Sequence, residues 1–92
     1  MLKPAEGTPR MRVKHGDTVF ILPHRINAVA ERTYPRDTRQ NVLARMMMQD
    51  HEQKGETYMV QTTWMTRATG AIYIHGRNGV TFSGHHSDVM RA

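Results

Sequence analysis

The segment from Ala71 to Ser83 constrains the fold most, because apolar and other residues alternate in it on both sides of a turn. Ile72 and Ile74 precede the turn, Val80 and Phe82 follow it, and all four stand at even-numbered positions. Side chains of a strand point alternately to its two faces, so each half of the segment predicts a strand with one apolar face.

The length of the turn decides whether the two apolar faces coincide. A two-residue Asn-Gly loop would place Phe82 opposite His75 and divide the apolar residues between the faces. A three-residue loop over residues 77–79, with Gly79 in the left-handed conformation, instead pairs Ile74 with Phe82. The hydrophobic pattern therefore predicts the three-residue loop.

Residues 58–67 are rich in β-branched and aromatic residues, which predicts a third strand in the same register. A turn at residues 68–70 would pair Trp64 with Ile74. The expected buried face is then Tyr58, Val60, Trp64, Ile72, Ile74, Val80 and Phe82. The expected opposite face is Gln61, Thr63, Met65, Arg67, Tyr73, His75, Arg77, Thr81 and Ser83.

The N-terminal half adds further elements. Residues 18–22 form a continuous apolar run typical of a central strand, and a Gly16-Asp17 turn would pair that strand with the residues around Val13. Residues 26–33 fit either a strand or a short helix, and we favour the strand. Residues 1–10 contain two prolines and a glycine, which predicts a mobile tail before a single domain over residues 11–92.

Residues 38–54 predict an amphipathic helix, with Asp37 as N-cap and Gly55 as the stop. Its helically spaced apolar stripe, expected to cover the sheet, is Val42, Leu43, Met46 and Met47. Residues 85–91 predict a short C-terminal helix. The expected fold class is α+β, with an antiparallel sheet of about five to six strands and one amphipathic helix packed on one face.

Composition excludes several classes of protein. The 92 residues include no cysteine, which rules out disulfides, zinc ribbons and thiol nucleophiles and favours a cytoplasmic location. No apolar run approaches the roughly 20 residues that span a bilayer, so we expect no membrane association. Thirteen Lys and Arg against eight Asp and Glu give a net charge of +5, which favours nucleic acid or an acidic protein surface as partner.

No chemical motif points to an enzyme. His75, His85, His86 and Asp88 are close in sequence, but adjacent histidines point in different directions and a metal needs three or four converging ligands. The phosphate-binding GK[ST] pattern, a nucleophile elbow and paired carboxylates are all absent. We therefore expect no metal, no cofactor and no catalysis.

A basic sheet face remains as the candidate site. Tyr73 and His75 offer rings for base stacking, and Arg67 and Arg77 offer guanidinium groups for phosphate. Arg12 and Lys14 extend the basic surface. The sequence thus predicts a small non-enzymatic protein whose Arg-rich face engages nucleic acid or a ribonucleoprotein complex.

The alternative is a protein that docks on another protein, with arginines and flexible methionines as anchors. Small size and the lack of a catalytic signature suit an inhibitor encoded by a phage or mobile element, for example an anti-CRISPR protein that blocks a surveillance complex. The sequence leaves the partner and the oligomeric state open.

Overall fold

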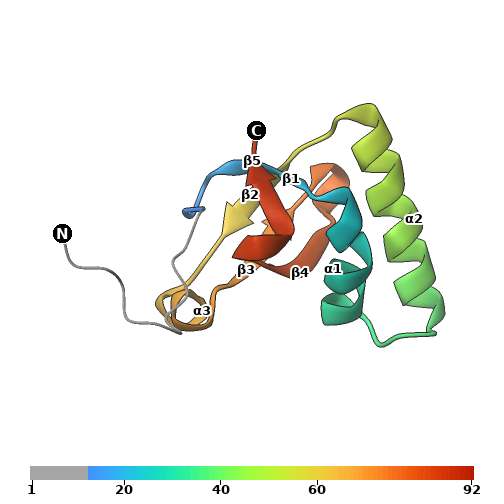
Figure 1. The fold of residues 1–92 in the computed structure, drawn as a ribbon, viewed down its shortest axis with the longest axis horizontal. Coiled ribbons are helices and arrows are strands. Elements are labelled where there is room, and N and C mark those ends of the chain that lie inside the picture. Colours follow the sequence, from blue (N-terminus) through green and yellow to red (C-terminus); the bar gives the residue numbers. More distant parts are fainter. Residues whose placement is uncertain (1–12) are drawn as a thin grey trace.

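A computed structural model of the chain describes residues 13–92, except for the side chains of residues 65–67. Its centre is a five-stranded sheet in the order β4-β3-β2-β1-β5, with every neighbouring pair antiparallel (Figure 1). The strands are β1 (Thr18–Ile21), β2 (Tyr58–Gln61), β3 (Ala71–His75), β4 (Thr81–His85) and β5 (Val89–Arg91).

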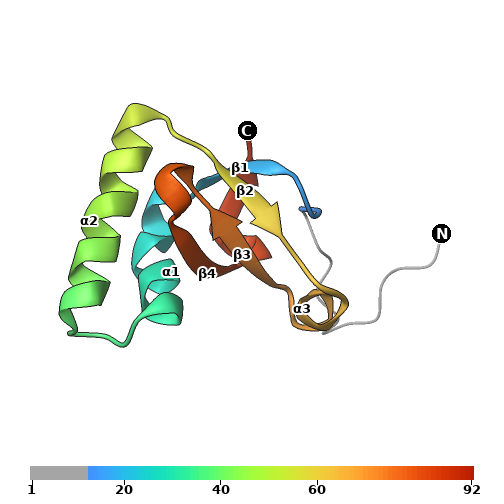
Figure 2. The ribbon, with the colours of Figure 1, turned by 180° about the vertical axis from the view of Figure 1, so that it is seen from behind.

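Two helices, α1 (Ile26–Thr33) and α2 (Arg39–Lys54), follow β1 and lie side by side at one side of the sheet (Figure 1, Figure 2). A third helix, α3 (Trp64–Thr69), connects β2 to β3. Three single-turn 3₁₀ helices complete the described chain: η1 (Pro23–Arg25), η2 (Arg77–Gly79) and η3 (His86–Asp88).

The sheet is strongly curled, because the three residues of η3 are the only connection between its two edge strands, β4 and β5. So short a link can span at most about 14 Å. Helix α1 lies along the free edge of β4, where the Ser83 N–H donates to Thr33 Oγ1 at 2.9 Å. The neighbouring His85 N–H donates to Asp88 Oδ2 at 2.9 Å, so this edge is covered rather than open to another strand.

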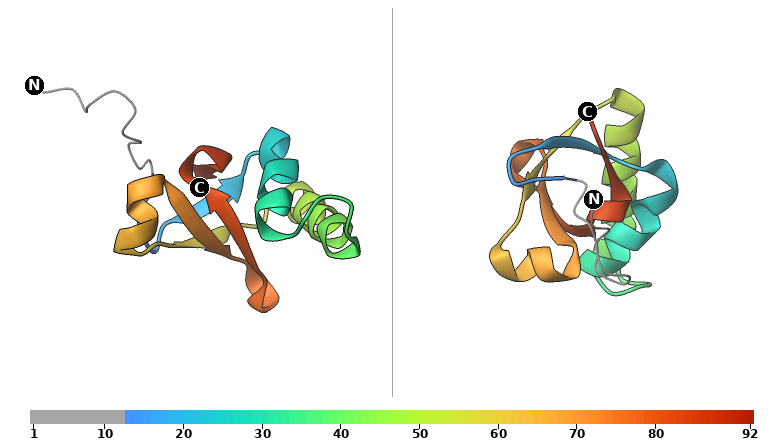
Figure 3. Two further views of the ribbon diagram at one scale, coloured as in Figure 1. Left: turned by 90° about the horizontal axis from the view of Figure 1, so that it is seen from below. Right: turned by 60° about the vertical axis from the view of Figure 1, so that its left-hand side comes forward.

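One hydrophobic core fills the space between the concave side of the sheet and the helices (Figure 3). Strand residues that alternate with exposed ones supply most of it, and α1 and α2 supply the rest apart from Val13. Its buried members are Val13, Val19, Ile21, Ile26, Val29, Ala30, Ala44, Met48, Tyr58, Val60, Ile72, Ile74, Phe82 and Val89.

The structure confirms the α+β class, the five-stranded antiparallel sheet and the register of the last hairpin. Ile74 pairs with Phe82, and Gly79 has the left-handed φ of +77° that the three-residue loop requires. Helix α2 ends at Gly55 as expected, while its N-cap is Thr38, whose side chain accepts from the Asn41 N–H.

One predicted strand is a helix instead, and another is a strand over only its first half. Residues 26–33 form α1, where the alanines and Glu31 follow their intrinsic preference for helix. The predicted strand 58–67 ends at Gln61, and α3 begins at Trp64. Val60 rather than Trp64 therefore pairs with Ile74, and Trp64 is 81% exposed.

The predicted N-terminal hairpin and C-terminal helix are also wrong. The Gly16 N–H donates to the carbonyl of Val60 at 2.7 Å, and β1 pairs with β2 and β5 on its two sides. After η3 the chain becomes β5, because the open edge of β1 offers hydrogen bonds that an isolated final turn of helix could not match. The predicted tail, residues 1–10, lies outside the described residues.

The orientation of α2 is the largest correction. The stripe expected to face the core is exposed: Val42, Leu43, Met46 and Met47. The buried face is instead Asn41, Ala44, Met48 and His51. Within residues 13–92, no helix has the length and apolar character needed to cross a membrane.

Candidate nucleic-acid interface

The convex side of β2, β3 and β4, called the outward face below, carries the predicted site. It comprises Met59, Gln61, Ala71, Tyr73, His75, Thr81, Ser83 and His85, which alternate with the buried residues of the same strands. No carboxylate stands at any of these positions. The strands themselves therefore carry no negative charge that would repel a polyanion at the outward face.

Tyr73 lies in the middle of the outward face and is 42% exposed. Its directly opposed neighbours are Gln61 on β2 and Ser83 on β4. Both are short or polar, so they leave the phenol ring accessible. An exposed ring between two such neighbours is suited to stacking against a flat ligand.

His75 is held in place from both sides. Its Nδ1 is 2.9 Å from Thr81 Oγ1, and its Nε2 forms a short hydrogen bond with Gln61 Oε1. These contacts connect β2, β3 and β4 across the outward face. Because both ring nitrogens are occupied, His75 offers a ligand the plane of its ring rather than a free hydrogen-bonding atom.

Trp64 is a site residue that the sequence reasoning missed. It is the first residue of α3, which links β2 to β3 at the end of the outward face where Gln61 pairs with Tyr73. Thr63 before it and Gly70 after it are ordinary helix start and stop signals, and they could have identified α3. The chain's one tryptophan is thus exposed to solvent at the α3 connection between β2 and β3.

Two exposed cations lie near opposite ends of the outward face. Arg77 is in η2, at the β3–β4 turn. Lys14 is in the loop that Gly16 fastens to Val60, near the end of β2. Neither side chain forms an ion pair among the described residues. Arg12 and the Arg67 side chain lie outside the described part of the chain.

Several other arginines are neutralised within the protein. Asp88 is fully buried and accepts from Arg25 Nε at 2.8 Å and from Arg32 Nε at 3.1 Å. Arg36 pairs with Glu31, and Arg91 pairs with Asp17. Asp88, Arg25 and Arg32, called the Asp88 cluster below, connect η1, α1 and η3. These contacts fix the end of β4.

A buried group of polar side chains lies under the start of β2. His51 Nδ1 forms a short hydrogen bond with the Tyr58 hydroxyl, and His51 Nε2 is 3.3 Å from Glu56 Oε2. Burial raises the pKa of Tyr58, and the negative charge of Glu56 raises that pKa further. The hydroxyl therefore stays protonated, and because Tyr58 is buried, no substrate can reach it.

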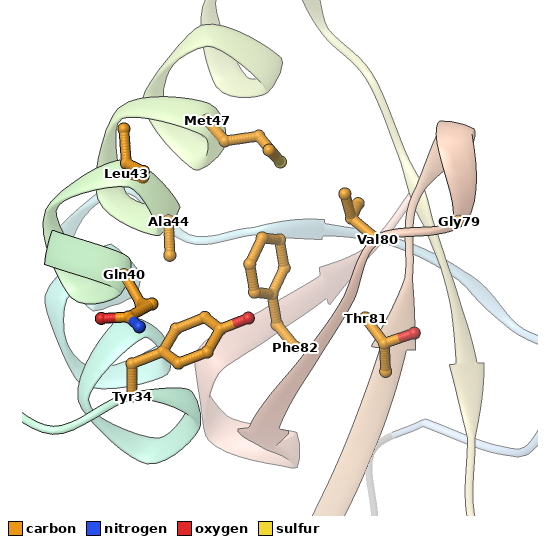
Figure 4. A pocket seen from close by; sticks show the side chains of 9 residues that line it. All are labelled: Tyr34, Gln40, Leu43, Ala44, Met47, Gly79, Val80, Thr81 and Phe82. Carbon is orange, nitrogen blue, oxygen red and sulfur yellow. The ribbon is translucent and has the colours of Figure 1, made fainter.

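An apolar groove of about 310 Å³ lies between α2 and β4, called the α2–β4 groove below (Figure 4). It is lined by Tyr34, Gln40, Leu43, Ala44, Met47, Gly79, Val80, Thr81 and Phe82. The lining contains no acid, histidine, lysine or arginine that could transfer a proton or hold a phosphate. Its chemistry suits apolar side chains.

The histidines near the C-terminus make local contacts. The rings of His85 and His86 are 4.3 Å apart, and His85 Nδ1 is 2.8 Å from Ser87 Oγ. Among residues 13–92, outside the undescribed side chains, no three His, Asp or Glu side chains converge as metal ligands.

The sequence matches no family model, and searches of curated proteins and of solved structures find no significant match.

Proposed function

We propose that this protein is a non-enzymatic binding protein whose outward face engages single-stranded nucleic acid, free or within a ribonucleoprotein complex. The supporting observation is the position of Tyr73 on a face without carboxylates that has Lys14 and Arg77 near its two ends. Exposed rings stack on bases of any sequence, while cations at the ends of the face attract the phosphates that connect those bases.

The distribution of acidic residues supports this choice of face. The described acids belong to the helices and their adjoining loops, or are already paired with arginine. They are Asp17, Glu31, Asp37, Asp50, Glu52, Glu56 and Asp88. The outward face therefore has cations near its ends and no carboxylate at its own strand positions.

The direct test measures the fluorescence anisotropy of a short labelled single-stranded oligonucleotide over a series of salt concentrations. Binding should weaken as salt rises, because phosphate contacts release counterions. Tyr73→Ala should weaken binding about 5- to 100-fold, with the salt slope unchanged, because it removes stacking alone. Arg77→Ala should weaken binding and also lower the salt slope by about one phosphate contact.

Arg36→Ala is the matched control, since it removes an exposed arginine that is paired with Glu31 away from the outward face. It should leave both the affinity and the salt slope close to those of the wild type. Affinity that is independent of salt, or equal effects of Arg36→Ala and Arg77→Ala, would contradict the proposal.

Docking on a host protein complex, as a phage-encoded inhibitor does, is the second candidate, and it is favoured by the apolar side chains exposed on α2. It predicts weak binding to free oligonucleotides but stable co-purification with one complex. An affinity pull-down from bacterial lysate, with and without nuclease, separates the two functions. Capture that survives nuclease favours protein docking, and capture lost with nuclease favours nucleic acid.

A further inference from the structure

Helix α2 presents a row of large apolar side chains to solvent, called the α2 ridge below. It comprises Val42, Leu43, Met46 and Met47, which are 38% to 59% exposed. At about 100° of rotation per residue, Val42 and Met46 lie opposite the buried face of α2, while Leu43 and Met47 lie at the side that borders the α2–β4 groove. Apolar side chains gathered in one patch, rather than scattered singly, indicate an interaction surface.

The ridge has opposite charges at its two ends. Arg39 stands four residues before Leu43 and Asp50 stands four residues after Met46, so both are in line with the ridge. Arg39 is in the first turn, where the helix dipole disfavours a cation, and it forms no ion pair among the described residues. Asp50 contacts Lys54 at 2.9 Å near the other end.

We propose that the α2 ridge binds a second copy of this chain, with the two α2 helices antiparallel about a two-fold axis between Leu43 and Met46. That axis places Arg39 opposite Asp50 of the partner subunit. It also places Leu43 opposite Met46 of the partner subunit and Val42 opposite Met47 of the partner subunit. The contact is self-complementary, as a two-fold interface must be.

Charge complementarity is the reason for choosing a second copy over another partner. A helix with a cation at one end of its apolar row and an anion at the other matches its own antiparallel copy at both ends. The antiparallel arrangement also brings the negative end of the partner's helix near Arg39, which relieves the unfavourable position of that cation.

The α2–β4 groove provides room for such an interface. Leu43 and Met47 form its α2 side, while Val80 and Phe82 form its sheet side (Figure 4). Met46 of the partner subunit lies opposite Leu43 in this arrangement, and its side chain can enter the groove. Methionine suits this role because its unbranched side chain adapts to irregular space.

Analytical ultracentrifugation of the full chain, over about 1 to 500 µM, tests the proposal. The wild type should convert from monomer to dimer within this range. Met46→Glu should raise the dimer Kd about tenfold or more, because it places a charge at the centre of the apolar contact. Met90→Glu is the matched control, since Met90 is 55% exposed against 59% for Met46, and it should dimerise as the wild type does.

A charge exchange tests the antiparallel arrangement itself. Arg39→Asp alone should weaken the dimer, because the introduced carboxylate would face Asp50 of the partner subunit at both ends of the contact. Adding Asp50→Arg should restore dimerisation. If the two positions did not interact, the double variant would dimerise no better than Arg39→Asp alone. Circular dichroism of each variant verifies the fold, and Leu43→Asp serves as a second ridge variant.

A wild type that stays monomeric throughout the range would overturn the proposal. Equal behaviour of Met46→Glu and Met90→Glu would overturn it as well. Failure of the double charge exchange to restore the dimer would exclude the antiparallel two-fold contact.

Discussion

Polar side chains inside this protein are matched to partners both near to them and distant from them in sequence. Asp88 meets Arg25 across 63 residues of chain, and the buried Asn41 donates to the carbonyl of Tyr34 while it accepts from Arg45. Such pairs make burial of polar groups tolerable, because an unpaired buried polar group is expensive. The pairs of Asp88 with Arg25 and Arg32 are invisible in local sequence patterns, which is why the sequence did not predict that Asp88 is buried.

Replacing Asp88 by Asn should lower the free energy of unfolding by about 2–4 kcal/mol, because two guanidinium groups would lose their shared counter-charge. Urea denaturation monitored by circular dichroism measures the change. Glu31→Gln disrupts the exposed pair with Arg36 and should have no measurable effect. A similar loss in the two variants would show that the Asp88 cluster does not stabilise the fold.

Gly70 and Gly79 both have a φ of +77°, so substitutions at the two positions differ only in the space around the added side chain. A Cβ on Gly79 would meet nothing within 4 Å, whereas one on Gly70 would lie 2.6 Å from His85 Nε2 and 2.7 Å from His86 Cδ2. His85 cannot easily move, because its ring also contacts Ser87.

Gly79→Ala should therefore cost only the left-handed conformation, about 1–2 kcal/mol in the free energy of unfolding. Gly70→Ala should cost about 1–3 kcal/mol more, because it adds overpacking to the same conformational cost. Urea titrations of both variants measure the difference, and equal losses would refute the crowding at Gly70.

Tyr58 should make stability depend on alkaline pH. Its pKa is raised in the folded state by burial, so the unfolded chain releases this proton first, near pH 10. Above about pH 10 the folded state then binds more protons than the unfolded state, and the free energy of unfolding falls as pH rises.

Between about pH 9 and pH 11, urea denaturation should show a steeper decline for the wild type than for Tyr58→Phe, approaching about 1.4 kcal/mol per pH unit. Near pH 7 the variant should be less stable, because His51 loses its hydroxyl partner. Parallel pH profiles of the two proteins would argue against this role of Tyr58.

At the scale of elements, turn and cap residues in the sequence correctly predicted the hairpin register and the end of α2. The spacing of Ile74 and Phe82 around Gly79 set the hairpin register, and Gly55 set the end of α2. These features depend on turn and cap geometry within a few residues. The sequence also identified Tyr73 as outward, since its parity follows from the same register.

Local sequence patterns do not determine which face of a helix packs inward, because tertiary contacts decide it. The apolar stripe of α2 was expected to face the core, but the helix buries Ala44 and Met48 with hydrogen-bonded Asn41 and His51. An amphipathic pattern shows that a helix has an apolar side, not that this side faces its own chain. The prediction for α3 was also wrong. The β-branched residues there suggested a strand, which placed Trp64 on the buried face.

Helix α3 makes a spectroscopic prediction through the chain's only tryptophan. Trp64 is 81% exposed, so its emission should be that of an indole in water and should be quenched strongly by iodide. A bound single strand that reaches Trp64 should protect it from iodide, because bases stack on exposed rings. Blue-shifted emission with little quenching in the free protein would mean that Trp64 is buried as the strand prediction required.

At the scale of the whole molecule, the two proposed surfaces lie on different sides of the fold. The outward face is on β2, β3 and β4, whereas the α2 ridge is on α2, which lies on the helical side of the molecule (Figure 3). The core and α1 stand between them. A dimer joined through α2 would leave both outward faces open, so that two copies present two separate sheets.

This separation predicts that the two activities are independent. Met46→Glu should dissociate the dimer yet bind a short single-stranded oligonucleotide with a Kd within about twofold of the wild type, because changes at distant sites are additive. Tyr73→Ala should weaken that binding while the dimer remains intact in the ultracentrifuge. The two assays on the same pair of variants give four values, and thermodynamic linkage requires any coupling to appear in both directions. If Met46→Glu also lost affinity for the short oligonucleotide, the two activities would not be independent. That result would contradict the placement of the two surfaces on different sides of the fold.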